Sequence, residues 1–87
     1  MKEVYFRVPD NSVICGYRMA HVTVPETVGE AVEKIKGMQS YLNYPFKAGE
    51  QPTNEYLGEQ AAFDRMVNNL PAKIRNSAGV KRALGEE

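Results

Sequence analysis

The stretch TVGEAVEKIKGMQSYL, residues 27–42, decides how the rest of the chain is interpreted, because its start signal, periodicity and composition agree. Thr27 followed by Glu30 is a capping box, in which the hydroxyl satisfies an amide of the first turn and the carboxylate reaches back to the cap. Apolar residues recur at steps of three and four, which is the spacing of one helix face; they are Val28, Val32, Ile35, Met38 and Leu42. The stretch therefore predicts an amphipathic helix that buries one stripe.

Two segments before this helix have the composition of strands. Residues 2–9 alternate between apolar and polar side chains, which is typical of a half-buried strand; the apolar face is Val4, Phe6 and Val8. Residues 9–12, PDNS, predict a turn, and residues 13–24 are again rich in β-branched and aromatic side chains. We therefore expect an antiparallel hairpin closed at 9–12, with a bulge or bend at Gly16 in its second strand.

The second half of the chain predicts a loop and further helices. Residues 44–52, YPFKAGEQP, are too rich in proline and glycine for a periodic structure. Thr53 is a good N-cap for a second helix that ends before Pro71, and its apolar face is expected to carry Tyr56, Phe63, Val67 and Leu70. A short helix is expected over 71–76, and a last turn over 80–84 before a frayed acidic end at Glu86 and Glu87.

These elements define an α+β fold in one domain, residues 1–87: an amino-terminal antiparallel β-hairpin packed on two antiparallel helices, plus a short carboxy-terminal helix. A chain of 87 residues has a thin core, and two strands leave open edges, so we expect a homodimer formed by edge pairing or helix packing. With one cysteine, no signal-peptide pattern and no apolar run long enough for a membrane span, the expected location is the cytoplasm.

No motif dictates a catalytic chemistry. Cys15 and His21 are each the only residue of their type, but six strand positions put them about 20 Å apart, so we interpret them as a small buried thiol and a strand histidine facing solvent or a partner. Glu30 and Glu33 are interpreted as a solvated helix face with intrahelical ion pairs. No metal-ligand spacing or nucleotide-binding glycine pattern occurs. We expect no enzyme, no metal and no cofactor.

Four aromatic residues around the loop are the main candidate for a binding site: Tyr41, Tyr44, Phe46 and Tyr56. Exposed aromatic side chains are good anchors for a protein partner, and the other interpretation is that these rings fill the gap between the two helices. The function we expect is a small non-catalytic protein-interaction module, an inhibitor or accessory factor of a phage or other mobile element, which acts by occupying a partner protein's surface.

The carboxy-terminal segment suggests a different function. Residues 71–84 carry four basic side chains and no acidic one, whereas residues 47–70 carry two basic against four acidic; the four are Lys73, Arg75, Lys81 and Arg82. The alternative function is therefore a dimeric nucleic-acid-binding regulator that contacts phosphates through this segment. A plain solvated tail is the other interpretation.

The segment His21-Val-Thr-Val-Pro, followed by two expected helices, resembles the ribbon-helix-helix repressors, in which strand side chains from a dimeric ribbon enter the DNA groove. The resemblance implies a DNA-reading role for His21 and Thr23. However, that family joins its helices by a short turn and has no preceding strand, whereas residues 43–52 and a whole extra strand are present here.

Tyr44-Pro45, Gln51 and Tyr56 are similar to the entry of the helical hairpin in phage proteins that sequester cyclic nucleotide signals. This similarity covers a short segment with imperfect spacing, and it implies a small ligand, such as a nucleotide, at a dimer seam. We assign the chain to neither family.

Overall fold

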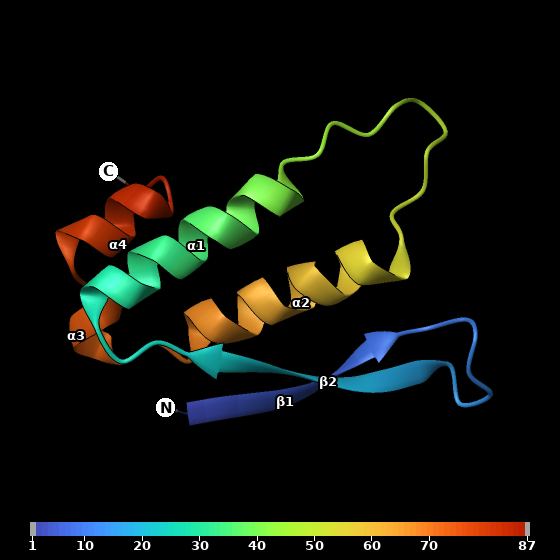
Figure 1. Cartoon of the computed structure of the whole chain (residues 1–87), viewed down its shortest axis with the longest axis horizontal. Helices are drawn as coiled ribbons and strands as arrows, with labels where there is room; N and C mark the ends of the chain where they lie inside the picture. The colour runs from blue at the N-terminus through green and yellow to red at the C-terminus, as the bar shows by residue number, and fades with distance from the viewer. Residues whose placement is uncertain (1, 87) are drawn as a thin grey trace.

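The computed structural model describes residues 2–86 and contains a two-stranded antiparallel sheet followed by two long and two short helices (Figure 1). The elements are β1 (Lys2–Pro9), β2 (Tyr17–Val24), α1 (Val28–Leu42), α2 (Asn54–Asn68), α3 (Ala72–Arg75) and α4 (Ala78–Ala83). The predicted α+β class, with a hairpin ahead of the helices, is confirmed. The carboxy-terminal part holds two short helices where the fold prediction had one.

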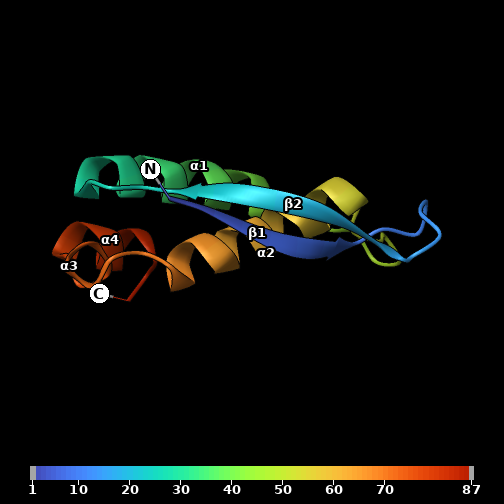
Figure 2. The same cartoon turned by 90° about the horizontal axis from the view of Figure 1, so that it is seen from below.

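The elements form a flat molecule. Helix α2 packs across one face of the sheet, α1 lies antiparallel beside α2, and α4 packs on α1 (Figures 1 and 2). The molecule measures 40 × 30 × 15 Å, and its radius of gyration is 14.2 Å, against about 12 Å for a compact chain of this length. Its accessible surface is 5886 Å², against about 5200 Å² expected from its mass. This chain therefore exposes more surface than a compact monomer of its size.

The core lies between the inner face of the hairpin, α2, and the adjoining sides of α1 and α4. Val8, Ile35, Met66 and Val80 are fully buried, one from each of these elements. The remaining core residues are Phe6, Val22, Val24, Ala31, Met38, Ala62, Leu70 and Ile74. With this few buried side chains, each contributes a large share of the stability.

The hairpin begins as predicted, and β1 keeps the predicted inner face. Its register pairs Pro9 with Tyr17 and Val4 with Val22. Phe6 and Val8 are buried and Val4 is half-buried, while the alternate side chains of β1 are exposed. The outer face of the sheet is therefore open to solvent.

The connection between the strands differs from the prediction. It spans residues 10–16, and the strand expected from Val13 starts at Tyr17. The Asp10 carboxylate accepts hydrogen bonds from the backbone N–H of Ser12 (2.9 Å) and from its hydroxyl (2.6 Å), and this local turn outcompetes strand pairing. Gly16 ends the loop in the left-handed region, with φ 79°, and its carbonyl accepts from Asp10 N–H at 3.0 Å. Gly16 is therefore a bend at the end of the loop, as one alternative predicted, and β2 contains no bulge.

Cys15 lies in this loop and is exposed, with its thiol donating to the Tyr17 carbonyl at 3.1 Å. The interpretation of Cys15 as a buried thiol was therefore wrong, because the segment that was to bury it is loop. Ile14 beside it is fully exposed.

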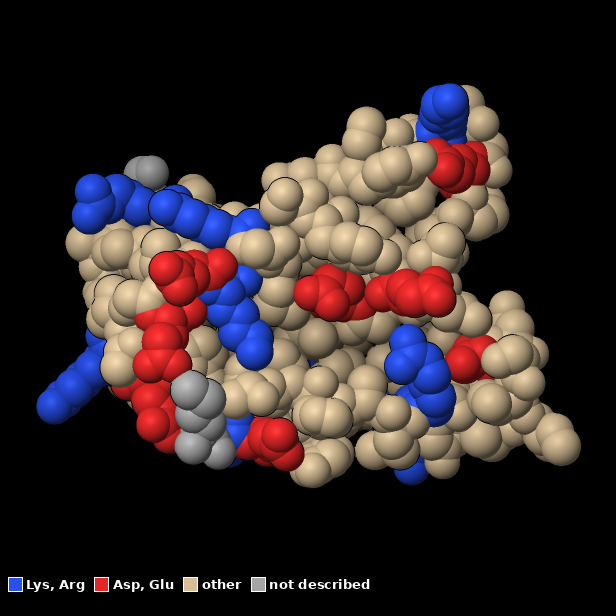
Figure 3. Space-filling model, in the orientation of Figure 1, with Lys and Arg blue, Asp and Glu red and all other residues tan. Residues whose placement is uncertain are grey.

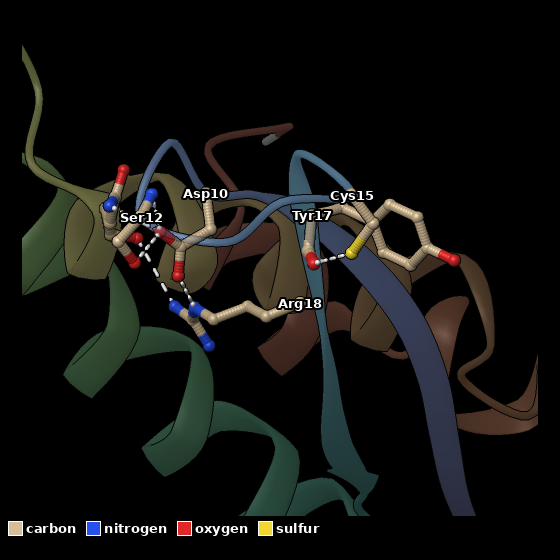
Figure 4. A network of polar contacts seen from close by, with 6 residues as sticks. Asp10, Ser12, Cys15, Tyr17 and Arg18 are labelled. Atoms are coloured by element: carbon tan, nitrogen blue, oxygen red, sulfur yellow. Dashed lines mark hydrogen bonds and ion pairs between the residues drawn. The ribbon is translucent and has the colours of Figure 1, made fainter.

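Asp10 also connects the loop to α2 (Figure 4). Its carboxylate accepts from the Asn54 side-chain amide at 3.2 Å and lies 3.5 Å from Arg18 Nε, and Arg18 in turn donates to the Asn54 carbonyl at 3.4 Å. Hydrogen bonds from Ser12, and then the Arg18 charge, hold the pKa of Asp10 below its ordinary value. The ionised carboxylate therefore stabilises the folded chain.

This lowered pKa predicts a stability that falls in acid. A group whose pKa is lower in the folded state stabilises at pH values above its unfolded pKa, and this contribution is lost as pH falls through the folded value. Glu86 acts in the same direction, because its pKa is lowered by Arg75. We expect Asp10→Asn, which keeps one oxygen acceptor, to lower the melting temperature at neutral pH. Below about pH 4 the melting temperature of this variant should fall less steeply than that of the wild type. Thermal unfolding followed by circular dichroism across pH checks this, and a decline as steep as in the wild type would contradict it.

Both long helices start at the predicted caps. Thr27 accepts from the Glu30 N–H at 3.2 Å, and its hydroxyl donates to the Glu30 carboxylate at 2.9 Å, so the capping box forms through the hydroxyl. Thr53 accepts from the Tyr56 N–H at 3.1 Å. In α1, Val28 was predicted in the apolar stripe but is 40 % exposed, because it lies in the first turn, beyond the core.

The buried face of α2 differs from the prediction. Gly58, Ala62 and Met66 face the core, and Leu70 just beyond the helix is also buried. Phe63 and Val67, predicted on the buried face, are half-buried on its border. Small residues lie where the helix crosses the sheet closely, and a periodicity based on large apolar side chains misses them.

The carboxy-terminal segment folds back on α1. Pro71 precedes α3, and the Ser77 hydroxyl caps α4 by accepting from Val80 N–H at 3.4 Å. The predicted frayed end is wrong for Glu86, whose carboxylate pairs with Arg75 at 2.6 Å, and Glu87 lies outside the described residues.

Candidate functional site

The structure brings the four predicted aromatic residues together at one end of the helical hairpin. Phe46 packs edge-on against Tyr44 and Tyr56, with ring centroids 5.0 and 4.8 Å apart, and Tyr41 lies 6.0 Å from Tyr56. Edge-to-face packing at these distances is favourable. The rings come from the end of α1, the connecting loop and the first turn of α2, so they form one cluster from three segments.

The loop that carries Tyr44 and Phe46 is held by Glu50. One oxygen of this carboxylate accepts from the Lys47 backbone N–H at 2.9 Å, and the other accepts from the Tyr44 hydroxyl at 3.0 Å. The hydrogen bond to this anion raises the pKa of Tyr44 above its ordinary value. Gly49 allows the turn, with φ 84°. Glu50 therefore fixes the shape of an otherwise irregular loop.

The four rings differ in burial, and this difference distinguishes the ring that packs between the helices from the rings that are exposed. Tyr56 is half-buried, and its hydroxyl donates to the Leu42 carbonyl at 2.7 Å, which satisfies a free carbonyl at the end of α1. Tyr41, Tyr44 and Phe46 keep 47, 49 and 37 % of their surface exposed. Tyr56 thus joins the two helices, and the other three present their rings to solvent.

The cluster forms one wall of an open pocket of about 530 Å³. Its lining comprises Ser40, Tyr41, Asn43, Tyr44, Pro45, Phe46, Glu50, Gln51, Thr53 and Tyr56. Among these described residues Glu50 carries the only charge, and none is basic. The pocket therefore suits an apolar group with a neighbouring cation, and it offers nothing that would neutralise a phosphate.

The basic residues of the second candidate site do not gather in the same way. Arg75 is paired with Glu86, and Arg82 Nε donates to the Ala78 carbonyl at 3.4 Å. Lys73 is exposed and Lys81 is half-buried. On the face seen in Figure 3, basic and acidic side chains are interspersed near α3 and α4. The local charge is smaller than the count of basic residues indicates.

The remaining candidates lie apart from this pocket. His21 is exposed on the outer sheet face, with its ring 5.5 Å from that of Tyr5, and Thr23 is half-buried on the same strand. β2 pairs with β1 of its own chain, where a ribbon-helix-helix strand pairs with a second chain. Within residues 2–86, no group of three or more His, Cys, Asp or Glu side chains could hold a metal ion. None of the helices described is long and apolar enough to cross a bilayer.

Comparison with known proteins gives no relative, since no family model, no curated protein and no solved structure matches this chain. The candidate site therefore rests on its own geometry.

Sequence reasoning missed Glu50 as the residue that shapes the site. A usable signal was present, because Gly49 favours a turn and Glu50 stands three residues after Lys47, the spacing at which an acidic side chain accepts from a backbone N–H.

Proposed function

We propose that this protein is a non-catalytic protein-binding module, an inhibitor or accessory factor that acts by occupying a partner's surface through the aromatic pocket. The observation that carries the proposal is the partial exposure of Tyr41, Tyr44 and Phe46 around one pocket whose loop is held by Glu50. Rigid tyrosine and phenylalanine rings bind partners with little loss of conformational entropy, and they are common among residues that dominate binding energy.

The chemistry of the pocket indicates which partner segment fits. Its aromatic walls favour a large apolar side chain, and the carboxylate of Glu50 at the pocket favours a Lys or Arg beside it. The partner segment is therefore an exposed peptide with a large apolar residue next to a basic one.

Selection from a random peptide library tests this preference before the partner protein is identified. We expect the wild-type protein to enrich peptides with a large apolar residue next to Lys or Arg. Tyr44→Ala combined with Phe46→Ala should weaken binding of these peptides by at least about a hundredfold, since two aromatic anchors are lost. Glu50→Gln can still accept from the Lys47 N–H and can donate to the Tyr44 hydroxyl. It should therefore keep the apolar preference and lose the basic one.

The matched control is Ile14→Ser, which removes the most exposed apolar side chain, on the hairpin loop and outside the lining of the pocket. This variant should bind the selected peptides as the wild type does, and circular dichroism should show all variants folded. Equal binding by the double aromatic variant would overturn the proposal. A partner captured from the source cell should likewise be retained by Ile14→Ser and lost by the double variant.

Salt dependence separates this function from nucleic-acid binding through Lys73, Arg75, Lys81 and Arg82. Phosphate contacts make affinity fall steeply with ionic strength, whereas binding by aromatic anchors responds weakly. We expect DNA retention to be weak, because Arg75 is already paired with Glu86. Tight retention that is abolished by changing the four residues to Gln would favour the alternative.

A further inference from the structure

The outer edge of β1 carries unpaired backbone groups. Asp10 N–H donates to the Gly16 carbonyl, which continues the ladder one position beyond the Pro9–Tyr17 pair. Because hydrogen-bonded pairs alternate in an antiparallel ladder, the even residues of β1 bond to β2 and the odd residues direct their backbone groups outward. Within residues 2–86, β1 makes no backbone hydrogen bond outside this ladder. Glu3, Tyr5 and Arg7 therefore present N–H and C=O groups to a further strand.

The side chains along this edge are complementary to themselves. If a second β1 pairs antiparallel about a two-fold axis at Tyr5, then Glu3 lies opposite Arg7 of the other copy, and Arg7 lies opposite Glu3. Side chains directly opposite each other across strands are about 5 Å apart, so two ion pairs flank a central pair of tyrosines. The same register uses the outward backbone groups of the odd residues on both strands. Charge and hydrogen bonding thus select the same alignment.

Other alignments satisfy fewer of these conditions. A two-fold axis at Glu3 or at Arg7 places like charges opposite each other. A register shifted toward the end of the strand requires a hydrogen bond from the backbone nitrogen of Pro9, which carries no hydrogen. The free edge of β2 contains no acidic residue, so it offers no such ion pairs. Figure 2 shows β1 on the side of the hairpin away from α1.

We propose that two copies of this chain associate through β1, antiparallel and in register about Tyr5, to form a continuous four-stranded sheet. The occupant of the open edge is a second copy, because the edge is complementary to itself in charge. The flat shape and excess surface of the single chain are in keeping with this assembly, and the interface is isologous, so it closes as a dimer.

Charge exchange tests the register directly. Glu3→Arg alone places two guanidinium groups opposite each other at both flanking pairs, and Arg7→Glu alone places two carboxylates there. Each change should weaken self-association at least about tenfold, because two cross-strand pairs become repulsive. When the two variants are mixed, every opposing pair is again of opposite charge, so a heterodimer should form with near wild-type affinity. Sedimentation velocity over a wide concentration range measures both variants and their mixture.

Charge reversals on α1 are the matched control. Glu33 and Lys36 are exposed and lie away from β1, so Glu33→Arg and Lys36→Glu should leave the dimer unchanged. Amide hydrogen exchange gives a second readout, since the N–H groups of Glu3, Tyr5 and Arg7 should become protected as concentration rises. A wild-type chain that stays monomeric, or a dimer that both β1 variants leave intact, overturns the proposal. Peptide binding at the aromatic pocket is measured separately and stands or falls independently.

Discussion

Replacing Met66 with Ala should lower the free energy of unfolding by about 2–5 kcal/mol, the range observed for truncating a large buried side chain. Met66 is completely buried, and its helix is the element that contacts both strands and α1. An 87-residue domain has a total stability of roughly 4–13 kcal/mol. We therefore expect this variant to be partly unfolded at 37 °C. Urea denaturation followed by circular dichroism measures the loss.

Phe63→Ala is the matched control for Met66→Ala. Phe63 lies on the same helix and is larger, but it is half-buried, so its truncation leaves a groove that water can fill and should cost less. The order of the two losses is the useful result. The sequence periodicity of large apolar residues would make Phe63 the core residue and so predicts the opposite order. A greater loss for Phe63→Ala would mean that α2 is rotated about its axis relative to this structure.

The elements themselves were predictable because their signals are local. The Thr27 and Thr53 caps, the alternation in β1 and the stop before Pro71 each depend on a few neighbouring residues. As a result β1, α1 and α2 lie where these signals placed them. The face that α2 buries depends on what it crosses. Gly58 and Ala62 are buried because the sheet approaches the helix closely there, and no local pattern marks a small residue as a contact.

The loop between the strands could not be predicted for a similar reason. Residues 13–15, Val-Ile-Cys, have high strand propensity, yet they lie in an exposed connection. The Asp10 carboxylate organises this loop, and it does so together with Asn54, which is 44 residues away in sequence. Strand propensity was therefore overridden by the Asp10–Ser12 turn, to which a contact from a distant segment adds support.

The aromatic residues of the candidate site could be predicted, but the shape of its pocket could not. The aromatic residues could be grouped because they surround one loop, but the pocket depends on the two hydrogen bonds of Glu50 and on the bond from Tyr56 to the end of α1. These contacts hold three rings at a fixed, exposed position. The proposed binding function depends on such fixed rings, since the same rings on a mobile loop would lose affinity to ordering.

Replacing Gly58 with Leu should lower the free energy of unfolding by about 1–3 kcal/mol, because a side chain of that size cannot fit beneath Arg18 and beside Val8. A Cβ at Gly58 would lie 2.8 Å from Arg18 Nη2 and 3.7 Å from Val8 Cγ1. A leucine must displace Arg18, which contacts both Asp10 and Asn54, and must also press on the buried Val8. The gain in helix propensity over glycine, about 1 kcal/mol, is too small to offset this.

Substitution of glycine by alanine separates the two causes of instability at position 58, which are contact with Arg18 and contact with the core. In α1, Gly37 has open space around its Cβ position, so Gly37→Ala should stabilise by about 0.5–1 kcal/mol through helix propensity alone. Gly58→Ala should fall short of this gain, because the added methyl group reaches the end of the Arg18 side chain. In an Arg18→Ala background the obstacle is gone, and Gly58→Ala should then stabilise as much as Gly37→Ala does. Equal effects of Gly58→Ala in both backgrounds would show that Arg18 does not lie over Gly58, and the double-mutant cycle measures this coupling directly.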